Sequence, residues 1–245
     1  MKVSIITIAT GKYTTFIPTL VEACEKFFLP KTNRKYIIFS DSDLNNINEK
    51  IKTIHQEKLG WPYDTMERFS MFQKAKTDIL DCDYVYFLNA NMLPVKEIGN
   101  EILPPQGKNL VGMIHPSFLN TDENLLPYER RDVSSACIPF GEGEFYFQGC
   151  FNGGRSEHFM EMCGYLIKLL EIDYANETYP IWHDESLLNK YYNKREDIHI
   201  LNPCYGYPEN VPGQYDPYSK LLKMFDVKMI QRNKTLYGGH KYMRS

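Results

Sequence analysis

The sequence lacks the apolar segments and cysteine pairs that mark membrane or secreted proteins. None of its apolar runs approaches the roughly 20 residues that a membrane-spanning helix needs. The opening stretch, MKVSIITIATGKY, turns polar too early for a signal peptide with its cleavage site, so we expect a first strand there. The six cysteines are scattered without CxxC spacing, which is typical of free thiols in a reducing compartment. These absences predict a cytoplasmic protein without a transmembrane segment.

The sequence also lacks an excess of either charge. Its 28 basic and 31 acidic side chains give a net charge of −3, which argues against nucleic acid as a partner and against a polybasic membrane contact. It has no internal repeat, low-complexity tract or linker. With 245 residues, of which 43% are hydrophobic, it can bury a substantial core. We therefore expect one domain spanning residues 1–245.

Buried strands alternate with helices in the N-terminal part of the chain. The β-branched run 2–9, KYIIFSD at 35–41 and YVYFL at 84–88 are typical of buried strands. Between them, apolar residues recur at helical spacing in 16–28 and 63–80. This alternation predicts an α/β fold with a parallel, doubly wound sheet. Later elements expected are strands near 109–115 and 144–151, helices near 155–173 and 184–193, and irregular chain from about 203.

Two amides follow the run 84–88, at a strand end, where an α/β sheet places its ligands. Asn89 and Asn91 flank Ala90, and asparagine is a common turn residue, so the pair fits an ordinary turn. The alternative is a ligand contact. Mg²⁺ and Mn²⁺ are held mainly by carboxylate oxygens, so two neutral amides would hold such an ion poorly. Their NH₂ groups could instead donate hydrogen bonds to phosphate or sugar oxygens.

A second candidate site lies in IWHDESLLNKYYN (181–193). Helical spacing of the apolar residues places Asp184 and Glu185 at a helix start, where acids are stabilised by the helix dipole and the first N–H groups. With His183 they also resemble metal ligands, although three adjacent residues at a helix start do not converge readily on one ion. A third interpretation is a carboxylate kept ionised beside a sugar, where it could stabilise or attack an electron-poor carbon. The local sequence leaves all three open.

Two further stretches carry weaker signals. FYFQGCFNGG (145–154) has alternating aromatics and ends in a glycine pair, which fits a strand and a turn. IHPSF (114–118) places a lone histidine, His115, at a strand end, and most such histidines are structural. Neither stretch identifies a function by itself.

Taken together and in this order, these stretches resemble glycosyltransferase family 6. That family includes the mammalian blood group A and B transferases, the α-1,3-galactosyltransferase and shorter bacterial members. The matching stretches are TGKYTTFIPTLVEACEKFF (10–28), YIIFSD (36–41), IHPSF, PYERR (127–131), FYFQGCFNGG and, most specifically, WHDESLLNKY (182–191). The resemblance covers nearly the whole chain. It implies a GT-A glycosyltransferase fold, with a Rossmann-like nucleotide-binding half and a mixed-sheet acceptor half.

Members of this family transfer galactose or N-acetylgalactosamine from a UDP-sugar to the 3-hydroxyl of a β-galactoside and retain the α configuration. Their mammalian forms bind Mn²⁺ through an Asp-x-Asp motif where this chain has Asn89-Ala90-Asn91. The resemblance therefore implies a donor site without a divalent metal cofactor, in which neutral amides touch the donor directly. Mammalian members also carry an N-terminal membrane anchor, and its absence fits the expected cytoplasmic, bacterial-type enzyme.

The resemblance also implies roles for individual residues. Glu185 matches the proposed nucleophile or ion-pair stabiliser and, with His115 and Trp182, an acceptor-contacting position. Asp184 matches a residue that binds donor-sugar hydroxyls. The other donor-side matches are Ala9, Thr10 and Tyr13 in the uridine-binding turn, Arg68 near the sugar and diphosphate, Asn89, Ala90 and Asn91 at the metal-motif position, Gln148, Gly149 and Cys150 beside the sugar, and Lys234 in a C-terminal segment that folds over UDP. Arg232 and Lys241 are weaker candidates for offsetting the diphosphate charge.

Three positions bear on substrate choice. Ser117 stands where members that accept unbranched galactosides carry tryptophan, so its small side chain implies a fucosylated acceptor, Fucα1-2Gal. Gln148 and Cys150 occupy the family's sugar-discriminating positions. Cys150 would crowd an N-acetyl group by volume, whereas Gln148 could hydrogen-bond the acetamido carbonyl, which discriminates more strongly. We expect UDP-N-acetylgalactosamine as donor, with UDP-galactose as the alternative.

Two other functions remain open at this point. A degenerate homologue could bind UDP-sugar or glycan without turnover, the loss of the acid pair being the loss of catalysis. A metal-dependent hydrolase is a third possibility. The retained WHDES stretch and Arg68 favour the active transferase over both.

Overall fold

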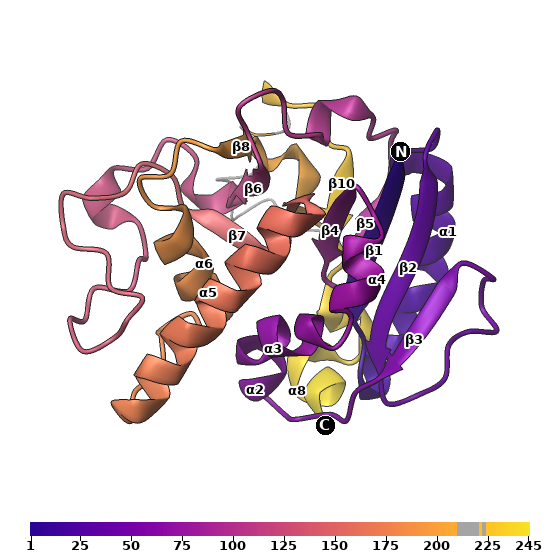
Figure 1. Cartoon of the computed structure of the whole chain (residues 1–245), viewed down its shortest axis with the longest axis horizontal. Coiled ribbons are helices and arrows are strands. Elements are labelled where there is room, and N and C mark those ends of the chain that lie inside the picture. Colours follow the sequence, from indigo (N-terminus) through magenta and orange to yellow (C-terminus); the bar gives the residue numbers. More distant parts are fainter. Residues whose placement is uncertain (210–220, 222–223) are drawn as a thin grey trace.

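A seven-stranded mixed sheet forms the centre of the molecule (Figure 1). The computed structural model describes residues 1–209, 221 and 224–245. The strands lie in the order β3-β2-β1-β4-β7-β6-β8. Their bounds are β1 (Lys2–Ile8), β2 (Asn33–Ser40), β3 (Ile51–His55), β4 (Tyr84–Leu88), β6 (Leu110–Ile114), β7 (Phe147–Arg155) and β8 (Ile198–Leu201).

The sheet is parallel on one side and mixed on the other. β1 runs parallel to β2 and β4, and β2 runs parallel to β3. β7, however, is antiparallel to both β4 and β6. The parallel arrangement predicted for the N-terminal strands is therefore confirmed, and the antiparallel strand β7 belongs to the other half of the sheet. The α/β fold of the GT-A type, with a parallel half and a mixed half, is confirmed.

The glycine pair at 153–154 lies within β7 and not in the predicted turn. A Cβ on Gly153 would clash with the carbonyl oxygen of Val85 in β4, and a Cβ on Gly154 would clash with that of Asn109 beside β6. Glycine in a strand often marks such a close backbone approach. The pair therefore lets β7 lie between its two antiparallel neighbours.

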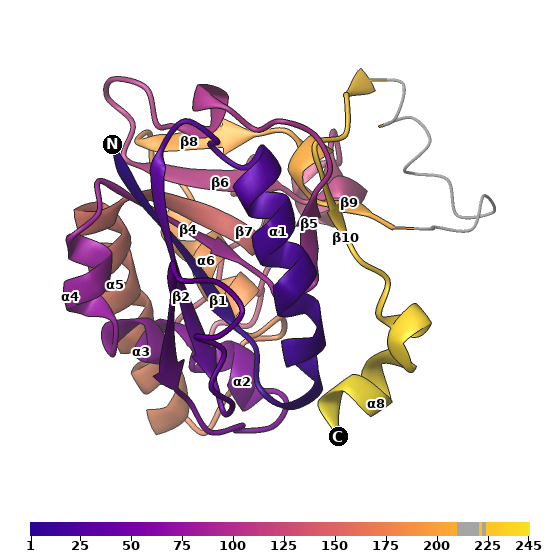
Figure 2. The same ribbon diagram turned by 90° about the vertical axis from the view of Figure 1, so that its right-hand side faces the viewer.

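Helices cover both faces of the sheet, as the two views show (Figures 1 and 2). α1 packs on one face with Ile5 and Tyr86, whereas α3, α5 and α6 pack on the other with Ile6 and Phe87. Successive side chains of a strand point to opposite faces, so each central strand supplies both core layers. The helices and helical turns are η1 (Gly11–Phe16), α1 (Ile17–Phe27), α2 (Tyr63–Met66), α3 (Arg68–Gln73), α4 (Lys76–Leu80), η2 (Asn100–Ile102), η3 (Pro116–Phe118), η4 (Glu123–Leu125), α5 (Ser156–Ala175), α6 (Asp184–Tyr192), η5 (Pro203–Tyr205), η6 (Lys234–Tyr237) and α8 (Gly239–Arg244).

The single helix predicted for 63–80 is three short helices, α2, α3 and α4. The backbone leaves the helical region at Glu67 (φ −84°, ψ 7°) and at Ala75 (φ −105°, ψ 11°). Apolar spacing alone did not show these breaks. After the first break, α3 begins at Arg68, whose side chain points inward and is 5% exposed.

The C-terminal segment returns to the end of β4 and forms a small second sheet. β5 (Met92–Pro94) pairs with β10 (Met229–Gln231), which also pairs with β9 (Tyr207–Pro208). η6 and α8 follow, and α8 lies beside η1, where Lys12 Nζ donates a hydrogen bond to the carbonyl of Tyr242 (3.1 Å) (Figure 2). The irregular chain predicted from about 203 is thus wrong for β10, η6 and α8, which depend on tertiary pairing.

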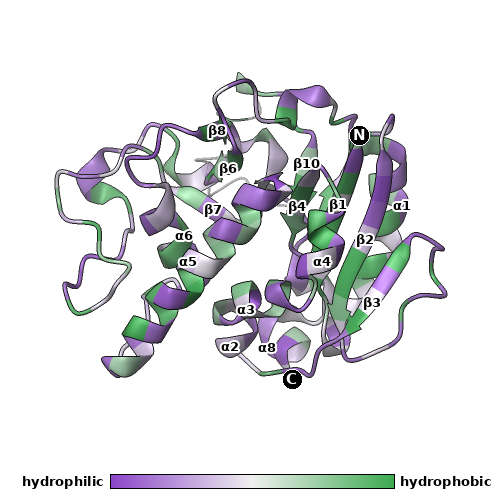
Figure 3. Cartoon of the chain, in the orientation of Figure 1, coloured by the Kyte–Doolittle hydropathy of each residue, from purple (hydrophilic) through white to green (hydrophobic). Residues whose placement is uncertain are grey.

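Hydrophobic residues concentrate along central strands such as β1 and β4 (Figure 3). Those strands are buried on both faces, with Val3, Ile5 and Ile6 at most 1% exposed. Within the part of the chain that the structure describes, no helix is long and apolar enough to cross a membrane.

Candidate active site

A pocket opens where β1 and β4 end, at the edge of the sheet where α/β proteins bind ligands. Its empty space, which includes open solvent at the mouth, is about 710 Å³. Seven residues expected on the donor side line it, and Lys234 is one of them. The lining residues are Ile8, Thr10, Tyr13, Lys58, Trp61, Asp64, Thr65, Arg68, Phe87, Asn89, Ala90, Asn91, Lys234 and Arg244.

The two amides after β4 have different environments. Asn91 is 2% exposed, and its side-chain Nδ2 donates to the backbone carbonyl of Arg232 (2.9 Å). The backbone N–H of Arg232 donates in turn to the backbone carbonyl of Asn91 (2.7 Å). Asn91 therefore ties the C-terminal segment to the pocket wall. Asn89 is partly exposed in that wall, and its carbonyl closes the turn by accepting from Met92 N (2.9 Å). Of the two, Asn89 has the freer side chain.

This tie brings basic residues to the pocket. Lys234 follows β10 directly and its ammonium lies 5.1 Å from the centre of the Tyr13 ring. The pKa of Lys234 is lowered to about 8, chiefly by burial and then by the positive charge of Arg244. The two cations thus repel one another in the empty pocket, and a bound anion would relieve that repulsion.

The two weaker candidates for the diphosphate charge lie outside the pocket lining. The guanidinium of Arg232 rests on the rings of Phe16 and Tyr237, at 5.3 and 4.7 Å, and donates to Thr19 Oγ1 (2.8 Å). Lys241 is exposed on α8. Arg244, three residues further, lines the pocket in its place.

Arg68, Asp184 and Glu185 form a charged cluster at the inner end of this site. An NH1 atom of Arg68 lies 2.8 Å from Asp184 Oδ2 and donates to the carbonyl of Gly149 (2.9 Å). The N–H of Gly149 donates to Glu185 Oε2 (2.7 Å). Strand β7 therefore positions both carboxylates through one residue, since its peptide groups contact the arginine on one side and Glu185 on the other.

The sequence folds this way because α6 begins at Asp184. His183 has a positive φ of 54°, a conformation uncommon for a side-chain-bearing residue. It turns the chain so that the two acids enter the first helical turn and face β7. A Cβ on Gly149 would lie 3.0 Å from Asp184 Oδ2, so glycine gives the carboxylates their room.

Burial affects the ionisation of both acids. The pKa of Glu185 is raised to about 7, chiefly by burial; the Gly149 N–H opposes the rise and the Asp184 carboxylate adds to it. Burial likewise raises the pKa of Asp184 to about 6, against the lowering effect of Arg68. Strongly perturbed acids in a cleft are candidates for catalysis. A cation formed beside them would favour their ionised forms.

The residues expected on the acceptor side lie next to this cluster. His115 is kept neutral because burial lowers its pKa to about 4, and its Nδ1 accepts from the N–H of Ser117 (3.1 Å). Its ring lies 6.0 Å from that of Tyr146, whose buried hydroxyl interacts with the Glu185 carboxylate and lowers the pKa of that carboxylate against the effect of burial. Trp182 precedes α6 and is 49% exposed. A polar acceptor surface thus adjoins Glu185.

Five donor-side candidates do not line this pocket: Gly149 and Asp184, which belong to the charged cluster, and Ala9, Gln148 and Cys150. Ala9 is fully buried, so only its backbone could meet a ligand. Cys150 is 3% exposed and packs in the core beside Leu88 and Met92. Gln148 is 8% exposed, and its Oε1 has no hydrogen-bond partner among the described residues.

Sequence reasoning missed seven residues that line the pocket. Ile8 and Phe87 belong to β1 and β4, and the other five lie outside the strands. Those five are Lys58, Trp61, Asp64, Thr65 and Arg244. The guanidinium of Arg244 lies 4.8 Å from the Trp61 ring, so α8 meets the loop before α2 across the pocket mouth. The rule that α/β proteins bind ligands where strands end identifies residues that follow strands. These five come instead from a loop, a short helix and the C-terminus.

The described residues do not offer a metal site of the usual kind. Over residues 1–209 and 224–245, no three histidine, cysteine or acidic side chains lie close enough to hold an ion. The carboxylates of the cluster are occupied by Arg68 and the Gly149 N–H.

Comparison with known proteins agrees with this geometry. The model of glycosyltransferase family 6 matches residues 1–236. The chain is 32% identical to the O-antigen biosynthesis glycosyltransferase WbnI of Escherichia coli, over 98% of this chain and 100% of that protein. It is 28% identical to the human globoside α-1,3-N-acetylgalactosaminyltransferase 1 (91% of this chain, 65% of that protein) and 26% identical to the rat histo-blood group ABO system transferase 2 (92% and 68%). The chain belongs to glycosyltransferase family 6 and is a hexosyltransferase.

Proposed function

We propose that this enzyme is a retaining, metal-independent α-1,3-N-acetylgalactosaminyltransferase that moves GalNAc from UDP-GalNAc to the galactose of Fucα1-2Gal acceptors. The observation that carries the proposal is the composition of the pocket. It joins neutral amides and three basic residues, Arg68, Lys234 and Arg244, to a buried carboxylate pair. That arrangement suits an anionic donor whose leaving group is stabilised by protein cations.

The residues present do not fit the Mn²⁺ used by mammalian members. Hard cations are held mainly by carboxylate oxygens, whereas the motif position offers Asn89 and Asn91, and one amide of this pair already bonds to Arg232. Protein cations can stabilise the charge that develops on departing UDP, and such stabilisation is commonly a large catalytic effect. Lys234 and Arg244 are placed for this, since both line the pocket.

Glu185 is the carboxylate proposed to act on the anomeric carbon. Its Oε2 accepts a hydrogen bond from the Gly149 N–H (2.7 Å), which fixes the carboxylate against β7. In retaining transfer, such a group either attacks the sugar or stabilises its oxocarbenium-like cation. Asp184, fixed by Arg68 at 2.8 Å, is placed to bind donor-sugar hydroxyls.

The choice of GalNAc rests on Gln148. Its unpartnered Oε1 is a hydrogen-bond acceptor, so it suits an acetamido N–H better than the acetamido carbonyl that we first expected. A galactose hydroxyl can also donate to this oxygen, so the donor panel below includes UDP-galactose. The human globoside relative is itself named for N-acetylgalactosamine transfer. UDP-galactose remains the alternative donor.

The proposal is tested by a panel of donors and acceptors assayed in excess EDTA. We expect UDP release on mixing UDP-GalNAc with 2′-fucosyllactose, at a rate that EDTA does not reduce by more than about twofold. UDP-galactose and the unfucosylated acceptor lactose serve as controls. Faster transfer from UDP-galactose would refute the donor assignment, and equal use of lactose would refute the acceptor assignment. Loss of nearly all activity in EDTA would refute metal independence.

The same assay separates a transferase from a non-catalytic binder. A non-catalytic binder would show UDP binding in calorimetry. It would form no UDP from the UDP-sugar when acceptor is added. Since Arg68, Asp184 and Glu185 form one connected cluster here, we expect turnover.

Asn89→Asp tests the neutral motif directly. A carboxylate there would face the diphosphate without a metal to screen it, and one such repulsion at about 6 Å is worth on the order of 1–2 kcal/mol at an intermediate dielectric. We therefore expect the KM for donor to rise roughly tenfold in EDTA. Asn100→Asp, an exposed site with the same change of charge, is the matched control. Asn91→Asp is less informative, because it would also place a carboxylate against the Arg232 carbonyl.

An unchanged donor KM in Asn89→Asp, equal to that of the control, would mean that Asn89 lies away from the diphosphate.

A further inference from the structure

The segment 179–182 lies between α5 and α6 and carries Trp182, the residue proposed to contact the acceptor. Of its four side chains, only that of Pro180 is buried. Tyr179, Ile181 and Trp182 are 48%, 51% and 49% exposed. Because most of its side-chain surface near Trp182 is exposed, hydrogen bonds to its backbone are an important part of what holds this segment.

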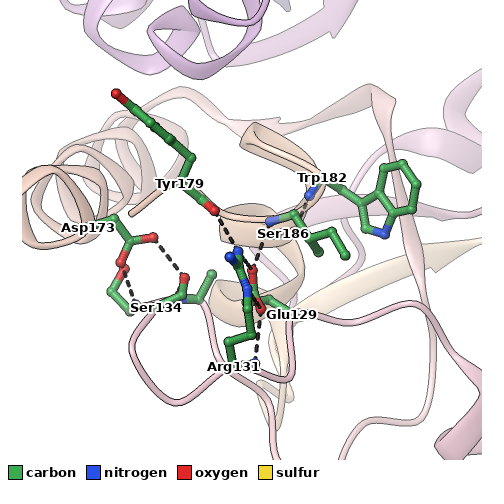
Figure 4. Close-up of polar contacts among 10 residues, drawn as sticks. Glu129, Arg131, Ser134, Asp173, Tyr179, Trp182 and Ser186 are labelled. Carbon is green, nitrogen blue, oxygen red and sulfur yellow. Dashed lines mark hydrogen bonds and ion pairs between the residues drawn. The ribbon is translucent and has the colours of Figure 1, made fainter. Parts of the chain in front are cut away.

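Two residues of the PYERR stretch bond to that backbone (Figure 4). The N–H of Ile181 donates to Glu129 Oε2 (2.8 Å), and an NH2 atom of Arg131 donates to the carbonyl of Tyr179 (2.6 Å). At its other end, the N–H of Trp182 donates to Ser186 Oγ (3.0 Å) in α6. The segment is thus held on both sides of Trp182.

Several hydrogen bonds hold the Glu129 carboxylate in this contact. It is 1% exposed, and both oxygens are in use: Oε1 accepts from the N–H and Nε of Arg131 (2.9 Å each), and Oε2 accepts from Arg131 NH2 (2.6 Å) and from Ile181 N. Burial tends to raise its pKa, but these donors outweigh burial, and its pKa lies below the ordinary value. A buried carboxylate so fully bonded is a fixed anchor.

The loop that carries this anchor is itself attached to the core. The Glu129 carbonyl accepts from Ile138 N (2.8 Å), and Ser134 Oγ donates to the fully buried Asp173 of α5 (2.8 Å) (Figure 4). Tyr128 OH donates to the carbonyl of Phe145 just before β7 (2.6 Å). The anchor therefore connects the segment 179–182 to α5 and to the strand that positions Glu185.

We propose that Glu129 and Arg131 are positioning residues, which hold Trp182 in register with Glu185 so that the acceptor hydroxyl meets the donor. This inference rests on the proposed acceptor role of Trp182. The connection to the reacting carboxylate is short, since the N–H of Glu185 donates to the Trp182 carbonyl (3.1 Å). Neither positioning residue lines the donor pocket. Their loss should therefore affect acceptor use far more than donor use.

The kinetic test uses Glu129→Gln, which keeps the shape but removes the charge that organises Arg131. We expect the acceptor KM to rise about tenfold while the donor KM and UDP affinity stay within about twofold. Arg131→Lys should change the acceptor KM in the same direction, because an ammonium lacks the planar fork that spans Glu129 and the Tyr179 carbonyl. Arg130→Met is the control, since Arg130 bonds to carbonyls of Glu123, Ile138 and Pro139 in the same loop but not to 179–182.

A second readout does not depend on any acceptor. The chain has two tryptophans, so protein labelled with 5-fluorotryptophan should give two ¹⁹F resonances, assigned with Trp61→Phe. We expect Glu129→Gln to shift or broaden the Trp182 resonance and to leave that of Trp61 unchanged. If wild-type enzyme used none of the acceptors tested, the proposed function would fail, whereas this spectrum would still decide the positioning role.

Two results would overturn the inference. One is an unchanged Trp182 resonance in Glu129→Gln. The other is a parallel rise of donor and acceptor KM with a lower Tm, which a general loss of structure would produce and which Arg130→Met would then share.

Discussion

Glu185→Gln should lower the transfer rate by at least about a hundredfold while UDP affinity stays within about twofold. The variant keeps the shape of the side chain but removes the negative charge beside the anomeric carbon. UDP binding should survive, because Glu185 does not line the pocket formed by Thr10, Asn89 and Lys234. The measurements are UDP release in steady state and UDP binding by calorimetry. Glu171→Gln, an exposed site on α5, is the matched control.

A loss of folding is not expected to confuse this result. Burial raises the pKa of Glu185 to about 7, so its folded pKa lies above the unfolded value. Ionising it therefore opposes folding, and this cost grows as pH rises from near the unfolded pKa through about 7. A neutral glutamine avoids that cost, so the Tm of the variant at pH 8 should equal or exceed that of wild type. Near-normal transfer would mean that Glu185 only begins a helix.

The sequence predicted the parts of the site that follow buried strands. Thr10 after β1 and Asn89 after β4 lie together because β1 and β4 are parallel neighbours, and parallel strands end at one edge. The helix start at Asp184 was also predicted from apolar spacing and is confirmed. These features are local or follow from one topological rule, so a pattern along the chain is enough to find them.

Other features depend on contacts that no local pattern shows. Asn91, expected on the donor side, lines the pocket, and its amide also bonds to Arg232, a residue 141 positions later, which no local pattern predicts. Arg244 reaches the pocket only because β10 pairs with β5 and brings the C-terminus back across the sheet edge. The direction of β7 was likewise hidden, since antiparallel pairing with β4 depends on the long return of the chain.

The two halves of the site therefore have different origins. β7 fixes Arg68, Asp184 and Glu185 through the peptide groups around Gly149. The cations proposed to face the donor phosphates, Lys234 and Arg244, belong by contrast to the C-terminal segment, which is held by Asn91 and by the short pairing of β10. A change in the C-terminal segment should accordingly alter donor binding and leaving-group stabilisation before it alters the carboxylate pair.

Lys234→Ala should lower kcat/KM for the donor by on the order of tenfold or more, since one charge-assisted hydrogen bond is worth about 1.5–3 kcal/mol. Lys241→Ala is the matched control, because Lys241 is an exposed lysine of the same segment that does not line the pocket. Equal kinetics for the two variants would remove Lys234 from the donor site.

The pH profile gives this prediction a second and sharper form. Burial and the charge of Arg244 lower the pKa of Lys234 to about 8, so the free enzyme carries this charge below pH 8 and loses it above. We expect kcat/KM for wild type to fall above about pH 8, and Lys234→Arg to remove that fall because a guanidinium stays charged. The fall in kcat should occur at higher pH than the fall in kcat/KM, since bound diphosphate favours the charged lysine. A wild-type fall that persisted unchanged in Lys234→Arg would assign the basic limb to another group and leave Lys234 without a part in stabilising UDP.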